Sequence, residues 1–201
     1  MVKNPEDATE LTNICAKYFD DLLNSKNQST QLEVLPKPAN DLPIKTDDFT
    51  PEELKSAIKS LKNGKASGVD SALTSETIKF GGDLSHSLIL NICNIVLNKG
   101  SPPRQWVTNI IFPIHKKGSK TDIKNYRGIS IMSSAAKLYN KMLLNRLYDK
   151  LNPLLRENQA GFRRNQNTTQ QISILRRIME SFNRKKNLPL IATFIDFSKL
   201  T

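Results

Sequence analysis

Apolar residues recur at helical spacing along most of the chain. When hydrophobic side chains return every three or four positions, they form one face of an amphipathic helix. Leu11, Cys15, Tyr18 and Leu22 follow this spacing near the start of the chain. The same pattern predicts helices over residues 5–24, 51–62, 75–80, 84–99, 133–152 and 167–182.

Two of these helices have recognisable boundary residues. Thr50 is a good N-cap, Pro51 suits the first helical position, and Glu53 completes a capping box. Asn63-Gly64 is expected to end this helix. Asp83 is expected to cap the strongly apolar helix that follows it.

Three stretches rich in β-branched and aromatic residues predict strands. Thr108–His115 and Tyr126–Met132 flank a polar turn at residues 116–124, so they are expected to form a hairpin. Leu188–Phe197 is apolar almost throughout, which predicts a strand buried on both faces. With the helices, these strands predict a helix-rich α+β protein.

A polar stretch from residue 24 to residue 48 contains three prolines and separates the first helix from the rest. Such a composition favours a linker or extended arm, and it is the best candidate for disorder in the chain. The predicted organisation is an N-terminal helix (1–25), a linker (26–48) and a single further domain (49–201).

The charge is large and unevenly placed. The net charge is +11, from 30 Lys and Arg against 19 Asp and Glu. Residues 1–53 hold 5 basic and 11 acidic groups, a net of −6, which leaves +17 for residues 54–201. A basic body with an acidic arm fits a polyanionic partner such as nucleic acid, although a solvated surface would look the same.

Several functional classes are disfavoured by the residue pattern. No apolar run reaches the length of a membrane span, and no secretory signal opens the chain, so a soluble intracellular protein is expected. Cys15 and Cys93 lack metal-ligand spacing and are expected to be small core residues. His86 and His115 are isolated, and Asn63-Gly64-Lys65-Ala66 lacks the Ser or Thr of a phosphate loop.

The polar turn of the predicted hairpin is a candidate phosphate-binding site. Lys116 and Lys117 can neutralise phosphates, and Gly118 allows backbone amides to approach an anion closely. Arg127, at the start of the second strand, could grip a phosphate through two hydrogen bonds. A charged turn that is merely solvated is the alternative.

One acidic residue stands at the end of the last predicted strand. Asp196 lies in the sequence Phe194-Ile195-Asp196-Phe197-Ser198-Lys199. A carboxylate at the end of an apolar strand is either a metal ligand or a polar cap of the strand, and the residues leave both open.

Taken in order, these segments resemble the conserved blocks of reverse transcriptases from non-LTR retrotransposons. The resemblance covers residues 49–199. It is carried by Phe49–Leu54 with Leu61–Asp70, by Trp106 with Ile110–Gly118, by Asn125–Ser130, by Gln159–Arg163 with Thr168-Thr169, and by Phe194–Lys199.

The resemblance implies a right-hand polymerase fold, in which residues 49–201 are the fingers and the first strand of an incomplete palm sheet. It implies that Asp196 is a catalytic metal ligand, with the carbonyl of Phe197 beside it. It also places the cations of the turn near nucleotide or template phosphates, and it assigns a loop to the template and primer track. That loop contributes Gln159, Gly161, Phe162 and Arg163.

The family uses Mg²⁺, copies an RNA template from a DNA primer, and acts on nuclear DNA; no membrane is implied. This chain departs from it in two ways. Gly128 stands where many members have Pro, and Leu200-Thr201 follow Lys199 where members continue with Ala-Phe-Asp. The later Tyr-Ala-Asp-Asp-type block is absent. We therefore expect a truncated fragment that holds no Mg²⁺ stably and is inactive alone; a non-catalytic nucleic-acid-binding module and an unfolded product are the alternatives.

Overall fold

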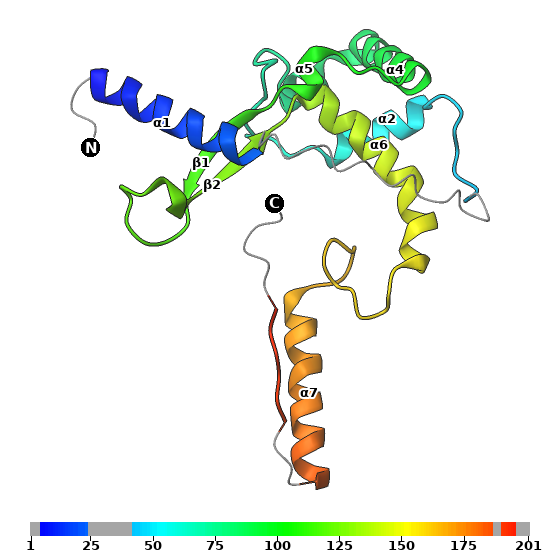
Figure 1. Cartoon of the computed structure of the whole chain (residues 1–201). Helices are drawn as coiled ribbons and strands as arrows, with labels where there is room; N and C mark the ends of the chain where they lie inside the picture. Colours follow the sequence, from blue (N-terminus) through cyan, green and yellow to red (C-terminus); the bar gives the residue numbers. More distant parts are fainter. Residues whose placement is uncertain (1–4, 24–41, 187–189, 196–201) are drawn as a thin grey trace, which may run out of the picture. The chain divides into compact units, whose positions relative to one another are not determined.

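The protein is described by a computed structural model that covers residues 5–23, 42–186 and 190–195. The chain divides into two compact units, Met1–Leu147 and Tyr148–Thr201, each of which is described by itself (Figure 1). The expected linker lies largely outside the described residues, and its last part, residues 42–48, forms neither helix nor strand.

The predicted helices and the hairpin of the first unit are confirmed. Their bounds are α1 Pro5–Leu23, α2 Pro51–Ser60, α3 Ser75–Phe80, α4 Gly82–Lys99, β1 Ile110–His115, β2 Tyr126–Ile131 and α6 Ser134–Leu151. Two short elements were not predicted: α5 Arg104–Val107 and the 3₁₀ turn η1 Ile123–Asn125.

α2 begins as its sequence dictates. The Thr50 side chain accepts a hydrogen bond from the Glu53 amide, and the Glu53 carboxylate accepts one from the Thr50 amide. This reciprocal capping box satisfies two amides that an open helix end would leave unpaired. The helix ends at Ser60, with Leu61 as its C-cap, so it stops before the expected Asn63-Gly64.

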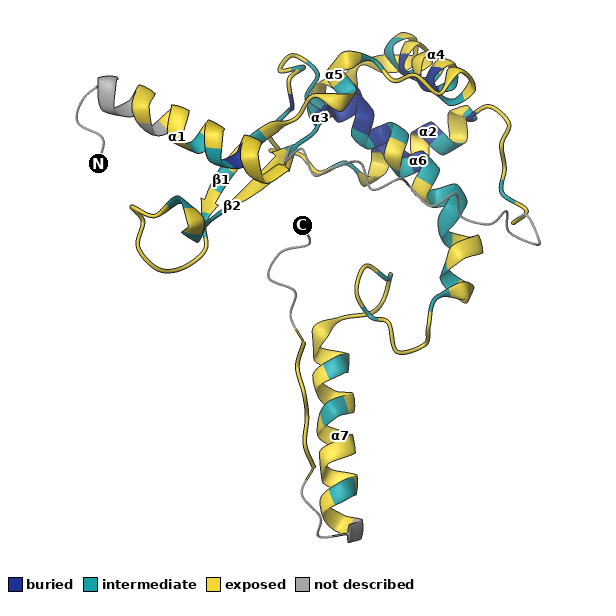
Figure 2. Cartoon of the chain, viewed as in Figure 1, coloured by how far each residue is buried: buried dark blue, intermediate teal, exposed yellow. Residues whose placement is uncertain are grey.

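The core of the first unit lies between α2, α3, α4 and α6. Figure 2 shows buried segments on α2, on α4 and on the first half of α6. The buried cluster consists of Phe49, Leu54, Ala57, Ile58, Ile78, Ile89, Cys93, Leu138 and Met142. Cys93 is fully buried, as predicted, and burial raises the pKa of its thiol to about 12. Cys15, expected to be a core residue, is only half-buried.

β1 and β2 form a two-stranded antiparallel hairpin with Phe112 opposite Ile129 and Ile114 opposite Arg127. Because side chains alternate between the faces of a strand, these residues share one face of the hairpin. Ile111 and Pro113 point to the other face, against which α1 packs.

The second unit is dominated by one long helix. It contains the 3₁₀ turn η2 Asn152–Leu154, a connection of successive turns, and α7 Thr168–Lys186. The irregular connection at residues 159–164 and the helix after it were both predicted. None of the described residues from 148 onward is buried.

Two predictions about local structure are wrong. α4 has Gly81 as its N-cap and no side-chain capping bond, so Asp83 lies inside the first turn rather than capping it. An acidic group there still favours the positive end of the helix dipole. Residues 190–195 form no strand and are exposed, because no described segment offers the hydrogen-bonding partner that a strand requires.

Candidate nucleic-acid interface

The turn between β1 and β2 is held in a defined shape by side chains at its base. His115 Nε2 donates to the Gly118 carbonyl at 3.1 Å, and Asn125 Nδ2 donates to the Ser119 carbonyl at 2.9 Å. The Tyr126 hydroxyl donates to the Lys120 carbonyl at 2.9 Å. Three successive carbonyls are therefore fixed from within the hairpin, which reduces the conformational freedom that the turn would lose on binding.

Gly118 is required by this arrangement. Its φ of +84° lies in the left-handed region that side chains disfavour. A Cβ at this position would also lie 2.8 Å from Nδ2 of Asn125, the amide that fixes the Ser119 carbonyl. The glycine seen in the sequence therefore shapes the turn.

The cations predicted to bind phosphate are brought together on this hairpin. Lys116 and Lys117 follow β1, Arg127 lies on β2, and all three side chains are exposed. Lys116 contributes its backbone amide to the hairpin through a 2.8 Å bond to the Asn125 carbonyl. Within the described part of the chain, these three side chains form no ion pair. Their charges are available to an anion.

The face of the hairpin that carries Arg127 is apolar and open. Phe112 is 57% exposed, and Ile110, Ile114 and Ile129 are each 45–48% exposed. Sequence reasoning missed this surface, because alternation predicts two faces of a strand but does not say which one is covered. An exposed aromatic ring beside an arginine is a surface on which a nucleobase can stack.

The predicted nucleic-acid track in the second unit is a loop organised by Arg163. Its Nε donates to Asn152 Oδ1 at 3.0 Å. Its Nη1 donates to the carbonyls of Arg156, at 3.1 Å, and Gln159, at 3.3 Å. Arg163 thus holds the loop closed on itself, so its guanidinium is largely occupied by these contacts.

Phe162 is the unusual residue of this loop. Its φ of +62° is left-handed, which is costly for a bulky side chain, and its ring is fully exposed. Gly161, next to it, has open space around its Cα. Gln159 is exposed beside them. The loop presents an aromatic ring to solvent at the expense of a strained backbone.

The expected catalytic centre is not part of the described structure. Asp196 and Phe197 both lie outside the described residues. Among the residues that are described, no three His, Cys, Asp or Glu side chains gather where they could hold a metal ion. No helix in the described ranges combines the length and apolar character of a membrane span.

An ion pair that the sequence did not reveal holds the start of the domain in place. The Arg146 side chain on α6 is 4% exposed and bonds to both carboxylate oxygens of Glu53, at 2.7 Å each. It also lies 4.3 Å from the centre of the Phe49 ring. Because its partners are more than 90 residues away, no local pattern could have predicted the pair.

Comparison with known proteins gives a consistent result. The sequence pattern of the family described as "Reverse transcriptase (RNA-dependent DNA polymerase)" matches residues 114–200. That range includes most of the hairpin, α6, the Arg163 loop and α7.

Relatives extend the match toward the N-terminus. A probable RNA-directed DNA polymerase from transposon BS of Drosophila melanogaster is 33% identical over 162 residues, 79% of this chain. RNA-directed DNA polymerases from mobile element jockey of D. melanogaster and D. funebris are 34% and 30% identical over 61% and 64% of it. The chain spans only 17%, 14% and 14% of these three relatives. It belongs to the reverse transcriptases of transposable elements, of the non-LTR type.

Proposed function

We propose that this chain forms the fingers of a right-hand RNA-directed DNA polymerase and the beginning of its palm. In this role the hairpin binds the phosphates of a nucleic acid or an incoming nucleotide. The observation that supports it most directly is a turn with three fixed carbonyls that displays Lys116 and Lys117 without ion pairs in the described chain.

The open face of the hairpin adds a second kind of contact. Phe112 and Ile129 offer an apolar surface for a base, while Arg127 on the same face can bond a phosphate through its planar fork. Phe162 in the second unit would provide another stacking surface for a template or primer. Charge and exposed aromatic rings together fit a single-stranded polynucleotide better than a small anion.

Catalysis would require more than these residues. Nucleotidyl transfer with two metal ions needs several carboxylates around cations roughly 3.5–4 Å apart. Asp196, with the Phe197 carbonyl, would supply one part of a Mg²⁺ site, and this assignment rests on the sequence pattern alone. We therefore expect the 201-residue chain by itself to bind nucleic acid but not to extend a primer in the presence of Mg²⁺.

Binding of a fluorescent single-stranded RNA, followed by anisotropy over a range of salt concentrations, tests the proposal. Replacing Lys116, Lys117 and Arg127 with Ala should weaken binding and flatten its salt dependence. Each phosphate contact to a single strand contributes about 0.7 to the slope of log affinity against log salt concentration. The magnitude of this slope should therefore fall by about 2 in the triple variant.

A matched variant separates site from overall charge. Lys55, Lys59 and Lys62 are also exposed, at α2 and just beyond it, so replacing all three with Ala removes the same charge. This control should retain most of the affinity. If both triple variants lose the same affinity for RNA, the hairpin is only one part of a diffuse positive surface and not a specific site. If the chain does not bind RNA at low salt, the proposal is overturned.

A further inference from the structure

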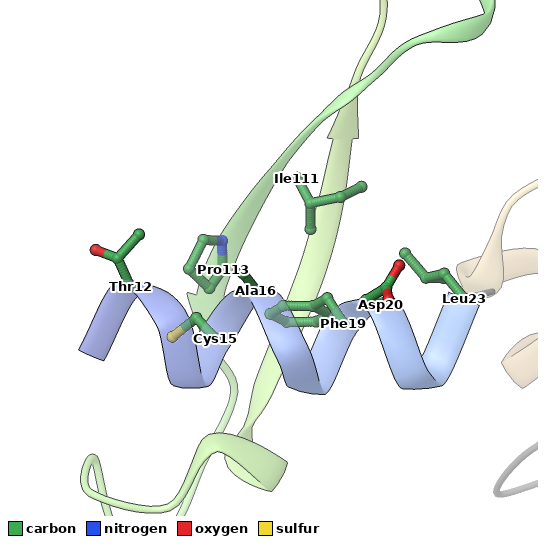
Figure 3. A pocket seen from close by; sticks show the side chains of 8 residues that line it. All are labelled: Thr12, Cys15, Ala16, Phe19, Asp20, Leu23, Ile111 and Pro113. Atoms are coloured by element: carbon green, nitrogen blue, oxygen red, sulfur yellow. The ribbon is translucent and has the colours of Figure 1, made fainter. Parts of the chain in front are cut away.

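One buried side chain of α1 packs against the hairpin. Among the described side chains of α1, only Phe19 is buried, at 6% exposure. It lines a groove of about 540 Å³ between α1 and β1, and Ile111 and Pro113 line the same groove from the hairpin side. Figure 3 shows the Phe19 ring below these two residues, with Cys15 one turn away on the same helix.

Gly128 makes room for this anchor. A Cβ at residue 128 would lie 2.8 Å from Cε1 of the Phe19 ring and 2.8 Å from Cγ2 of Ile111. Any side chain at this position would therefore push the Phe19 ring out or displace the hairpin strand beneath it. Because residue 128 has no side chain, the Phe19 ring of α1 can pack closely against the hairpin.

The two elements carry opposite charges. α1 contains five acidic residues and one basic residue, a net of −4. The hairpin and its turn, residues 110–131, contain five basic residues and one acidic residue, a net of +4. Opposite charges on neighbouring elements attract one another most strongly within the Debye length, which is about 8 Å at physiological salt.

We propose that α1 is an autoinhibitory element, which docks on the hairpin through Phe19 and competes electrostatically with nucleic acid for the hairpin's cations. Because α1 buries little side-chain surface apart from this ring among its described residues, the docking is expected to be reversible. The negative charge of the docked helix lowers the electrostatic potential that a polyanion meets. If α1 is docked nine-tenths of the time and blocks binding, the apparent affinity falls about tenfold. This inference rests on the proposed RNA binding by the hairpin.

The test compares the affinity of the full chain and its variants for the same fluorescent single-stranded RNA. Phe19→Ala, which removes the anchor, should raise the affinity roughly three- to tenfold. Gly128→Ala, which expels the anchor from the hairpin side, should act in the same direction. In the double variant the two effects should not add, because both release the same contact.

Two further variants separate docking from other effects. Ile14→Ala shortens an apolar side chain of α1 that is half exposed and does not line the groove, so it should leave the affinity unchanged. Glu10→Gln with Asp21→Asn keeps the anchor and removes two negative charges, so it should raise the affinity by less than Phe19→Ala does. If either anchor variant unfolds, as reported by the fluorescence of Trp106, this charge variant decides.

The outcomes distinguish this inference from the function on which it rests. If the natural chain binds RNA, and Phe19→Ala and the charge variant bind it with the same affinity, the autoinhibition is overturned but the RNA binding stands. RNA binding that is present in the natural chain and roughly three- to tenfold tighter in Phe19→Ala would support the autoinhibition. A failure of every variant to bind RNA at low salt would overturn both proposals.

Discussion

At the residue scale, Arg146 uses all five of its donors in the first unit. Its guanidinium donates to Glu53 and to backbone carbonyls of residues 45, 47 and 48, and it packs against the Phe49 ring. A planar group with five donors can do this, whereas a lysine cannot. These bonds tie the segment before α2 to α6.

The pair changes the acidity of its carboxylate. The hydrogen bond from Arg146 is the main cause that lowers the pKa of Glu53 below its ordinary value of 4.5, against the opposing effect of burial. The same bond raises the pKa of Arg146. A carboxylate whose pKa is lowered by folding stabilises the folded state above its unfolded pKa, and this contribution is lost as the pH falls through the folded value.

Glu53→Gln should therefore reduce stability in a pH-dependent way. At neutral pH we expect a loss of about 1–2 kcal/mol, since a charged hydrogen bond is replaced by a neutral one. The difference between natural chain and variant should stay constant down to about pH 5 and shrink as the pH falls below 4.5. Denaturant unfolding followed by the fluorescence of Trp106, the single tryptophan, measures it.

Glu52 provides the control for this experiment. It lies in the same first turn of α2 but is exposed. Glu52→Gln should change the free energy of unfolding by less than about 0.5 kcal/mol at any pH. If the loss in the free energy of unfolding caused by Glu53→Gln did not vary with pH, charge pairing with Arg146 would not be its source.

At the element scale, the sequence predicts those features of helices and turns that depend on residues close together in the chain. The capping box at Thr50 and the hydrophobic spacing of α7 depend on residues a few positions apart, and both appear as predicted. Asp83 was a plausible cap that the chain does not use, because Gly81 takes the N-cap position between α3 and α4. Short polar residues near a helix start do not by themselves fix the first residue.

Features that depend on distant partners were not predictable. The described part of the apolar stretch at 188–197 forms no strand, because a strand depends on a neighbour and not on its own residues alone. The Arg146–Glu53 pair joins residues 93 positions apart. For the candidate site, the sequence predicted that the hairpin carries a group of cations, but it predicted neither the open apolar face of the hairpin nor the Phe19 contact.

Gly118→Ala tests whether the shape of the turn matters to the hairpin. An alanine there must adopt a left-handed backbone and would collide with Asn125, so we expect a local cost of about 1–2 kcal/mol. Amide hydrogen exchange of the paired strands should then accelerate roughly 5–30-fold.

Gly161→Ala is the matched substitution. Nothing lies within 4 Å of its added methyl group, and the residue does not have a positive φ. Exchange in the hairpin should be unchanged in this variant. Unaltered exchange in Gly118→Ala as well would mean that the turn tolerates other conformations, and the proposed preorganisation of its lysines would lose its basis.

At the scale of the whole molecule, the burial seen in the described ranges is confined to the first unit. Every buried residue among those described lies between Phe19 and Met142, and the core cluster lies between Phe49 and Met142. The second unit instead exposes large apolar side chains, with Ile191, Phe194 and Ile195 each 79–86% exposed. Exposed apolar segments of this kind promote association between chains.

A chain ending at Leu155 should therefore unfold like the full chain. It retains α6, η2 and all of the core, so its melting temperature, followed by Trp106, should change by no more than about 2 °C. It should also be more soluble, because it lacks the apolar residues after α7. Replacing Ile191 and Phe194 with Ser in the full chain should give a similar gain in solubility without truncation. A large drop in the melting temperature of the shortened chain would contradict this prediction and would mean that the second unit contributes to the stability of the first.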